Sequence, residues 1–302
     1  MKKFLVNLWN RSYDQYLYIK DCLFILYDSI YRNVFPKPQI VSNIDTINYI
    51  IEHKCSVSRF GDAEMKVVRG MNISYQNNSD RLTIMMQTVL SQPIPNHIVC
   101  LPDVFGSLHI YNEDNRTFWR KHLAYYRSLW YENIDMQRLY YNAFMSRCYM
   151  PYNDKSDAKL CFDRLKLIWN NRSVLIVEGE RSRLGYGNDL FANVKYIKRI
   201  LGPNLGAFEY YDSILQEVLK YDSGEYLVLL ALGPTATVMA YELAKRGYQA
   251  IDIGHVDIEY EWYKMSATKK VPVKNKYVHE ANYGVVEDPE DVDYQKEIVW
   301  HY

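Results

Sequence analysis

The sequence predicts an α/β protein whose core is a mainly parallel β-sheet with helices on its faces. The evidence lies in the second half of the chain. Ser173–Val177 and Tyr226–Leu232 are short apolar runs that suit buried strands, and Ala236–Arg246 has the length and spacing of a helix. Gly247 ends that helix, and Tyr248–Ile253 is the next strand. Strands that alternate with helices in this way form a parallel sheet with right-handed crossovers.

The first 40 residues are predicted to be an N-terminal helical extension, and residues 41–302 to be the main domain. Apolar and aromatic side chains recur in the extension at the spacing of an amphipathic helix: Trp9, Tyr13, Tyr16, Leu23, Tyr27 and Ile30. Phe35–Pro38 breaks this helix and marks a linker. Such a stripe can lie on a membrane surface, but it more often packs on the protein body or on a second subunit of a homo-oligomer.

The region after the linker follows a less regular pattern. Ser42 and Asp45 are typical of a helix start and lead into a helix over Thr46–His53. Cys55–Phe60 is a short strand, and the stretch from about residue 79 to residue 170 is expected to be mainly helical. Three further elements are expected: strands at His97–Leu101 and Tyr196–Leu201, and a helix at Tyr210–Tyr221.

The composition excludes several classes of protein. Lysine and arginine total 36, and aspartate and glutamate also total 36, so the basic excess of a nucleic-acid-binding protein is absent. The five cysteines form no C-x-x-C pair, and neither cysteine nor histidine has the spacing of a zinc site. Reduced cysteines and the lack of a signal peptide indicate a cytoplasmic protein. Peripheral attachment to the inner membrane face is the alternative that the N-terminal helix leaves open.

Two carboxylates with D-x-E spacing follow the strand at Cys55–Phe60. If the backbone stays extended past Gly61, Asp62 and Glu64 point to the same side and repel each other unless a cation lies between them. Carboxylate oxygens suit Mg²⁺ or Mn²⁺, and Arg59 can bind a phosphate. Arg59 and Gly61 are the residues of this segment expected to bind the donor or cofactor. The alternative is a solvated turn, because D-x-E is a common pattern.

A glycine-rich loop over Glu178–Asp189 follows the buried strand at Ser173–Val177 and is expected to precede a helix. Its glycines and arginines allow the backbone to approach an anion closely. The loop matches neither G-x-G-x-x-G nor the P-loop pattern, so neither of those sites is predicted. The loop residues expected to bind the donor or cofactor are Glu180, Arg183, Gly187 and Asn188.

A second candidate anion site is the helix start at Gly233, Pro234 and Thr235. Glycine permits a tight turn, and proline suits the first helical turn because its missing N–H has no role there. The free N–H groups and the threonine hydroxyl can seat a phosphate. Plain helix initiation is an equally good interpretation.

The segment Asp252–Trp262 carries five ionisable side chains at the end of a predicted strand. If it is helical, His255 and Glu259 share one face, and Asp257 and Glu261 share another. A histidine–carboxylate pair can act as a general base or bind a metal or phosphate. An acidic, solvated helix is the alternative.

Together these segments resemble the bacterial GT-D-fold glycosyltransferases, a family first catalogued as a domain of unknown function. Five segments carry the resemblance: Ser58–Glu64, Ser146–Arg147, Val177–Asp189, Leu232–Ala240 and Gly247–Trp262. The resemblance implies a Rossmann-like sheet, a UDP-sugar donor such as UDP-glucose, and Mn²⁺ or Mg²⁺. It also implies that the D-x-E motif of the family falls on Asp62 and Glu64, with Ala63 in place of the glycine often found between them.

The hypothesis is therefore a metal-dependent transfer of a hexose from a UDP-sugar to a glycan, glycoprotein or lipid-linked acceptor, as in polysaccharide biosynthesis. Asp62 and Glu64 would place the metal, while Arg59, Arg183 and the helix start at residues 233–235 neutralise the leaving UDP. Two rivals remain open. One is a metal-dependent hydrolase or modifying enzyme for nucleotide sugars or sugar phosphates, and the other is a non-catalytic subunit of a glycan assembly complex.

The group that deprotonates the acceptor hydroxyl is sought in the acidic segment after the last predicted strand. Glu259 is the first choice, with His255 beside it, and Asp257 and Glu261 are further candidates.

Overall fold

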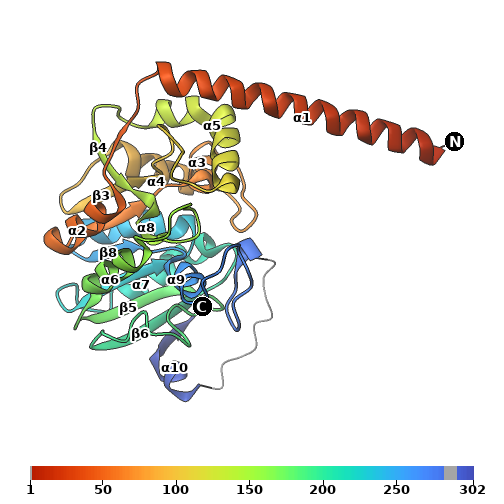
Figure 1. Ribbon diagram of the computed structural model, residues 1–302. Helices are drawn as coiled ribbons and strands as arrows, with labels where there is room; N and C mark the ends of the chain where they lie inside the picture. The colour runs from red at the N-terminus through yellow and green to blue at the C-terminus, as the bar shows by residue number, and fades with distance from the viewer. Residues whose placement is uncertain (1, 282–290) are drawn as a thin grey trace.

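The computed structural model describes residues 2–281 and 291–302 (Figure 1). Within these residues one sheet contains nine strands in the order β1-β4-β3-β2-β8-β7-β5-β6-β9. All neighbouring strands are parallel. The strands are β1 (Gln39–Ile40), β2 (Ser56–Arg59), β3 (His97–Leu101), β4 (Leu139–Asn142), β5 (Ser173–Gly179), β6 (Tyr196–Gly202), β7 (Tyr226–Ala231), β8 (Gln249–Asp252) and β9 (Ile298–His301).

Helices connect most of these strands and cover the sheet. The α-helices are α1 (Lys2–Val34), α2 (Asn43–His53), α3 (Asp62–Val68), α4 (Asp80–Ser91), α5 (Glu113–Asn133), α6 (Ala158–Trp169), α7 (Tyr211–Val218), α8 (Pro234–Lys245), α9 (Val256–Lys264) and α10 (Val292–Glu297). Three short 3₁₀ helices complete the described elements: η1 (Ala143–Ser146), η2 (Ala207–Tyr210) and η3 (His279–Ala281).

The sheet separates two hydrophobic cores, because successive side chains of each strand point to opposite faces. In β5, Leu175 and Val177 belong to one core, and Val174 and Ile176 to the other. Helices α3, α4, α5, α7 and α8 complete the first core, and α2, α6 and α9 complete the second (Figure 1). Burial on both faces explains why the central strands have continuous apolar sequences.

The predicted fold class, a mainly parallel α/β sheet with a helical N-terminal segment, is confirmed. The strand at His97–Leu101 has the predicted bounds. The helix start at Ser42 is also confirmed, because the Ser42 hydroxyl accepts a hydrogen bond from the backbone N–H of Asp45 at 3.2 Å. The prediction omits β1, β4 and β9, which are only two to four residues long and give little periodic signal.

One predicted helix does not form. The glycine-rich loop was expected to precede a helix, but turns and bends connect β5 to β6 over residues 180–195. Gly185 and Gly187 both have positive φ, at +76° and +75°, and such values interrupt a right-handed helix.

Helix α1 extends from the main body along α5, and its N-terminal half projects beyond it (Figure 1). Its C-terminal half is anchored by the fully buried Asp28, which pairs with Arg32 and with Arg127 of α5. Arg32 also donates a hydrogen bond to the Gly106 carbonyl at 2.7 Å. No helix in the described part of the chain has a stretch long and apolar enough to cross a bilayer.

Candidate active site

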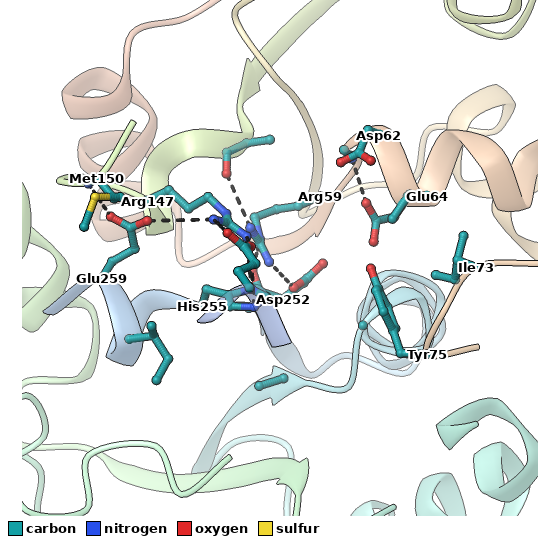
Figure 2. A pocket seen from close by; sticks show the side chains of 18 of the residues that line it. Arg59, Asp62, Glu64, Ile73, Tyr75, Arg147, Met150, Asp252, His255 and Glu259 are labelled. Carbon is teal, nitrogen blue, oxygen red and sulfur yellow. Dashed lines mark hydrogen bonds and ion pairs between the residues drawn. The ribbon is translucent and has the colours of Figure 1, made fainter. Parts of the chain in front are cut away.

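A cavity of about 1100 Å³ opens at the carboxyl edge of the sheet. The segments that follow β2, β3, β4, β5, β7 and β8 all contribute to its wall. Ligands of parallel α/β proteins bind at this edge, because the strand ends and the first turns of the following helices meet there. Figure 2 shows Asp62, Glu64 and Tyr75 on one side of the cavity, with Arg147, His255 and Glu259 on the other.

Arg59 lies between these two sides and is fixed by Asp252 at the end of β8. Its Nη2 donates to Asp252 Oδ1 at 2.7 Å, and its Nε donates to the Asp252 carbonyl, also at 2.7 Å. Gly254 makes room for the guanidinium, because a Cβ at this position would lie 1.9 Å from Arg59 Nη2. Arg59 lines the cavity as predicted, but its charge is already paired.

The D-x-E motif lies at the start of a helix and not on an extended chain. Asp62 and Glu64 are the first and third residues of α3, so their side chains diverge around the helix axis. Asp62 pairs with Lys66 at 3.3 Å, and Glu64 Oε2 accepts from the Gly61 N–H at 2.8 Å. The predicted extended geometry is therefore wrong, although both carboxylates line the same cavity.

The electrostatics around Glu64 favour a bound cation. Burial, together with the nearby Asp252 and Asp62 carboxylates, raises the pKa of Glu64 to about 7. The described residues contain no group of three or more His, Cys, Asp or Glu side chains that would hold a metal unaided. Two carboxylates still fit Mg²⁺ or Mn²⁺, because these ions commonly take one or two carboxylates and complete their coordination with substrate phosphates and water.

The opposite wall carries positive charge around Arg147, which follows the 3₁₀ turn after β4. Arg147 donates two hydrogen bonds to the carboxylate of Glu280, and Lys270 pairs with the same carboxylate. Burial alone would raise the pKa of Glu280, but the charges of Arg147 and Lys270 and the hydrogen bonds from Arg147 outweigh it and hold that pKa well below its usual range. Glu280 is thus ionised, and its carboxylate contacts the positively charged side chains of this wall.

His255 is neutral in this environment. Its burial, followed by the charge of Arg147, lowers its pKa to about 3. Arg147 Nη2 lies 3.2 Å from His255 Nδ1, and because a guanidinium only donates hydrogen bonds, Nδ1 accepts and the ring proton is on Nε2. His255 therefore presents a hydrogen-bond donor to the cavity, which does not suit the predicted role of general base.

Glu259 and Asp257 line the cavity, and each uses at least one carboxylate oxygen to hold the fold. Glu259 Oε2 accepts from the backbone N–H groups of Tyr149 and Met150 at 3.1 and 2.7 Å, and burial raises the pKa of Glu259. Asp257 accepts from the Gly185 N–H at 2.8 Å and pairs with the buried Lys276 at 2.6 Å. The Asp257 carboxylate is thus engaged and does not suit the predicted role. Within the described residues, Glu259 Oε1 has no hydrogen-bond partner and lies 3.8 Å from Arg147 Nη1, so its role as general base stays a prediction.

Most residues predicted from the glycine-rich loop lie outside the cavity. Gly179, Ser182 and Leu184 contribute to its wall, whereas four residues expected to bind the donor do not: Glu180, Arg183, Gly187 and Asn188.

Three of these four residues make contacts that hold the loop in place. Glu180 accepts from Asn204, Arg183 is buried and donates to the Asn275 carbonyl, and Asn188 donates to Asp257 and Glu261. Gly187 has a φ of +75°, and a Cβ added to it would have no atom within 4 Å. The sequence suggested an anion-binding loop, but its polar groups face other parts of the protein.

The start of α8 contributes to the cavity through Gly233. Gly233 has φ of +56°, and the Tyr75 ring approaches to 3.0 Å from where its Cβ would be, so only glycine fits under this ring. Pro234 and Thr235 are buried behind Gly233 and are not part of the wall. Within the described residues, the Thr235 hydroxyl is buried and has no hydrogen-bond partner.

The sequence prediction assigned no role to three residues that shape the cavity, although Arg147 belongs to one of the segments that carry the resemblance. Arg147 follows the short strand β4, which gives too weak a pattern to place it. Tyr75 lies in an irregular loop, and its own backbone carbonyl accepts a hydrogen bond from the Gly206 N–H at 2.9 Å. Glu280 is 133 residues from Arg147 in the chain, and no local spacing could indicate that contact.

The sequence and the fold are both similar to known proteins. The family described as "Glycosyltransferase GT-D fold" matches residues 57–281. The curated protein "Glycosyltransferase GlyD" of Streptococcus pneumoniae serotype 4 is 40% identical over 276 residues, which cover 89% of this chain and 34% of that protein. "Probable glycosyl transferase Gly" of Streptococcus gordonii is 37% identical, over 86% of this chain and 38% of that protein. The chain thus spans about a third of the length of these curated relatives.

Two solved structures share the architecture. A structure described as "The highly conserved domain of unknown function 1792 has a distinct glycosyltransferase fold" superposes with a TM-score of 0.84 and 37% identity, covering 93% of this chain and 99% of that one. "A New Glycosyltransferase (DUF1792) from Streptococcus sanguinis" gives a TM-score of 0.82 and 36% identity, covering 88% of this chain and 99% of that one.

Proposed function

The chain belongs to the family of glycosyltransferases with the GT-D fold, and on that basis we propose that it transfers a hexose from a UDP-sugar to a hydroxyl of an acceptor. The acceptor would be a glycan, a glycoprotein or a lipid-linked sugar, as in polysaccharide biosynthesis. Mn²⁺ or Mg²⁺ would serve as the cofactor. The enzyme would act in the cytoplasm.

The observation that carries this proposal is the polarity of the cavity. A pair of carboxylates, Asp62 and Glu64, faces a wall of hydrogen-bond donors and cations formed by Arg147, His255 and Lys270. A nucleoside diphosphate bound with a divalent metal has the complementary arrangement, with a cation on one side and phosphate oxygens on the other. The location at the carboxyl edge of a parallel sheet supports the same ligand class.

Asp62 and Glu64 are the residues that would hold the metal. When bound, such an ion neutralises the charge that develops on the leaving diphosphate. In the structure Lys66 pairs with Asp62, and the Gly61 N–H orients Glu64. Because the two side chains diverge from the first turn of α3, each would hold the metal directly or through water.

Arg147 and His255 would bind the diphosphate oxygens from the other side. The neutral imidazole donates through Nε2, and the guanidinium offers further N–H groups. In the present structure the Glu280 carboxylate occupies this place, since it contacts Arg147 and lies 3.8 Å from His255 Nε2. Donor binding would therefore require the Glu280 carboxylate to leave Arg147.

The test is donor turnover by the purified chain. UDP-glucose, UDP-galactose and a GDP-sugar are incubated separately with Mn²⁺ or with EDTA, and the released nucleoside diphosphate is quantified by chromatography. The proposal predicts UDP release that needs the metal and accelerates when a glycan acceptor is added. Release that no acceptor accelerates would indicate a hydrolase. Absence of both turnover and UDP binding would contradict the proposal.

A further inference from the structure

Helix α1 carries an exposed apolar seam with alternating spacings of three and four residues. Its members are Tyr13, Tyr16, Lys20, Leu23, Tyr27, Ile30 and Val34. The six apolar members are each between 48% and 70% exposed. This spacing averages 3.5 residues, which is the repeat of a helix that packs lengthwise against a second helix.

The body of the protein covers a different face of α1. Phe24 packs on Tyr125 of α5 with ring centroids 4.4 Å apart, and Asp28 is buried between two arginines. These contacts lie on the C-terminal half of the helix, while the N-terminal half projects past α5 (Figure 1). The seam is therefore not the surface that attaches α1 to its own domain.

The exposed seam is large for a monomer, and α1 carries acidic as well as basic residues. From Tyr13 to Val34 it runs for about 32 Å, at about 1.5 Å per residue, and each aromatic side chain in it offers on the order of 100 Å² when half exposed. Over the whole helix the sequence has five basic residues (Lys2, Lys3, Arg11, Lys20 and Arg32) and three acidic ones (Asp14, Asp21 and Asp28), and Arg32 is paired with Asp28. A helix that binds an anionic bilayer has instead a polar face rich in lysine and arginine.

We propose that α1 pairs antiparallel with α1 of a second copy of this chain, so that the protein is a homodimer. The second copy is the partner that matches the seam in length and spacing, because it carries the same seam. Lys20 selects the orientation. In a parallel pair Lys20 would face Lys20 of the second copy, whereas in an antiparallel pair it faces Leu23. The same register brings Tyr13 against Ile30, and Tyr16 against Tyr27.

The surroundings of Lys20 fit this register. Its ammonium lies 5.9 Å from the Phe24 ring centroid and 5.8 Å from that of Tyr125, so the charge is directed to the side and its apolar stem crosses the seam. A Leu23 side chain of the second copy can pack on that stem.

A groove beside the seam gives the second helix further contact. It has a volume of about 650 Å³ and is lined by side chains of α1 together with Ala124 of α5: Tyr16, Ile19, Lys20, Leu23, Phe24, Tyr27 and Ala124. In the antiparallel register the projecting half of one helix lies over the seam of the other, next to this groove. Each copy thus covers the surface that the other leaves exposed.

Leu23 provides a matched pair of variants that tests both the dimer and its orientation. Sedimentation equilibrium of the full chain is expected to show a dimer. Leu23→Lys would place a lysine opposite Lys20 and is expected to raise the dimer dissociation constant at least about 100-fold, because like charges in contact are strongly unfavourable. Leu23→Glu loses the same apolar side chain but gains an ion pair with Lys20, and is expected to stay within about tenfold of the wild type.

Controls and contrary outcomes separate the alternatives. Tyr18 is 71% exposed but off the seam, so Tyr18→Glu is expected to leave the dimer unchanged. Circular dichroism confirms that each variant folds. Dissociation by Leu23→Lys and Leu23→Glu alike would contradict the antiparallel pairing. A wild-type chain that is monomeric at every soluble concentration would contradict the dimer, and flotation of that monomer with phosphatidylglycerol vesicles would show that the seam binds lipid instead.

Discussion

The variant Glu280→Gln tests whether the donor diphosphate binds beside Arg147 and Lys270, because it should then increase the affinity for UDP. The glutamate contacts both Arg147 and Lys270 within the cavity, so a bound diphosphate and this carboxylate compete for the same cations. The glutamine keeps the size of the side chain and removes its charge. The variant should therefore bind UDP more tightly than the wild type does, which is opposite to the usual effect of removing a contact from an active site.

The magnitude follows from the two ion pairs. Glu280 and Arg147 are each 22% exposed, and a hydrogen bond between charged groups contributes about 1.5–3 kcal/mol. The Lys270 side chain is 39% exposed, and such a solvent-screened pair contributes about 0–1 kcal/mol. Release of Glu280 thus costs about 2 kcal/mol in the wild type, and its removal should lower the Kd for UDP roughly 30-fold.

Calorimetric titration of UDP in the presence of Mn²⁺ measures this difference. Glu242→Gln is the matched control, because Glu242 also pairs with two cations, Lys245 and Arg246, but lies outside the cavity. Its Kd for UDP should equal that of the wild type. Weaker UDP binding by a folded Glu280→Gln protein would show that Glu280 supports the donor, and would refute the competition.

Other contacts of the cavity lead to distinct outcomes. A Cβ at Gly254 would lie 1.9 Å from Arg59 Nη2 with φ at +48°, so Gly254→Ala should cost at least about 2 kcal/mol of unfolding free energy and abolish UDP binding, as urea unfolding and titration would show. Because the pKa of Glu64 is raised from 4.5 to about 7, the metal-free protein should lose about 3 kcal/mol of stability as the pH rises through that interval. Glu64→Gln should remove this loss, measured by urea unfolding at several pH values. His255, with a pKa of about 3, should add no inflection to the pH–rate profile of donor turnover between about pH 5 and 8, so His255→Gln should change the rate but not the shape of the profile.

The sequence could predict the fold because its signals are local. The apolar runs of β5 and β7 and the glycine that ends α8 each lie within a few residues of the element they define. The same holds for Asp62 and Glu64, which follow β2 directly and therefore reach the carboxyl edge of the sheet. Only their relative direction is wrong, because α3 begins at Asp62 itself.

The roles of the other polar residues depend on contacts between distant parts of the chain. Glu259 is the first choice of general base in the sequence, but one of its carboxylate oxygens accepts from the backbone of Tyr149 and Met150, which are 110 and 109 residues away. Asp257 is tied in the same way to Gly185, 72 residues away. No spacing within the acidic segment carries this information, so the sequence could name the polar residues at the strand ends but not separate functional from structural ones.

The central claim is that Asp62 and Glu64 hold a divalent metal against the diphosphate of the donor. Titration of Mn²⁺, followed by electron paramagnetic resonance with and without UDP, tests it most directly in the wild type, Asp62→Asn and Glu64→Gln. Asp114→Asn is the control, because Asp114 also lines the cavity but lies on α5. The account predicts that UDP strengthens Mn²⁺ binding in the wild type and the control, and that each motif variant folds but binds Mn²⁺–UDP at least about 100-fold more weakly, a loss of about 2.7 kcal/mol. A folded Asp62→Asn protein that binds Mn²⁺ and UDP as tightly as the wild type would contradict the claim.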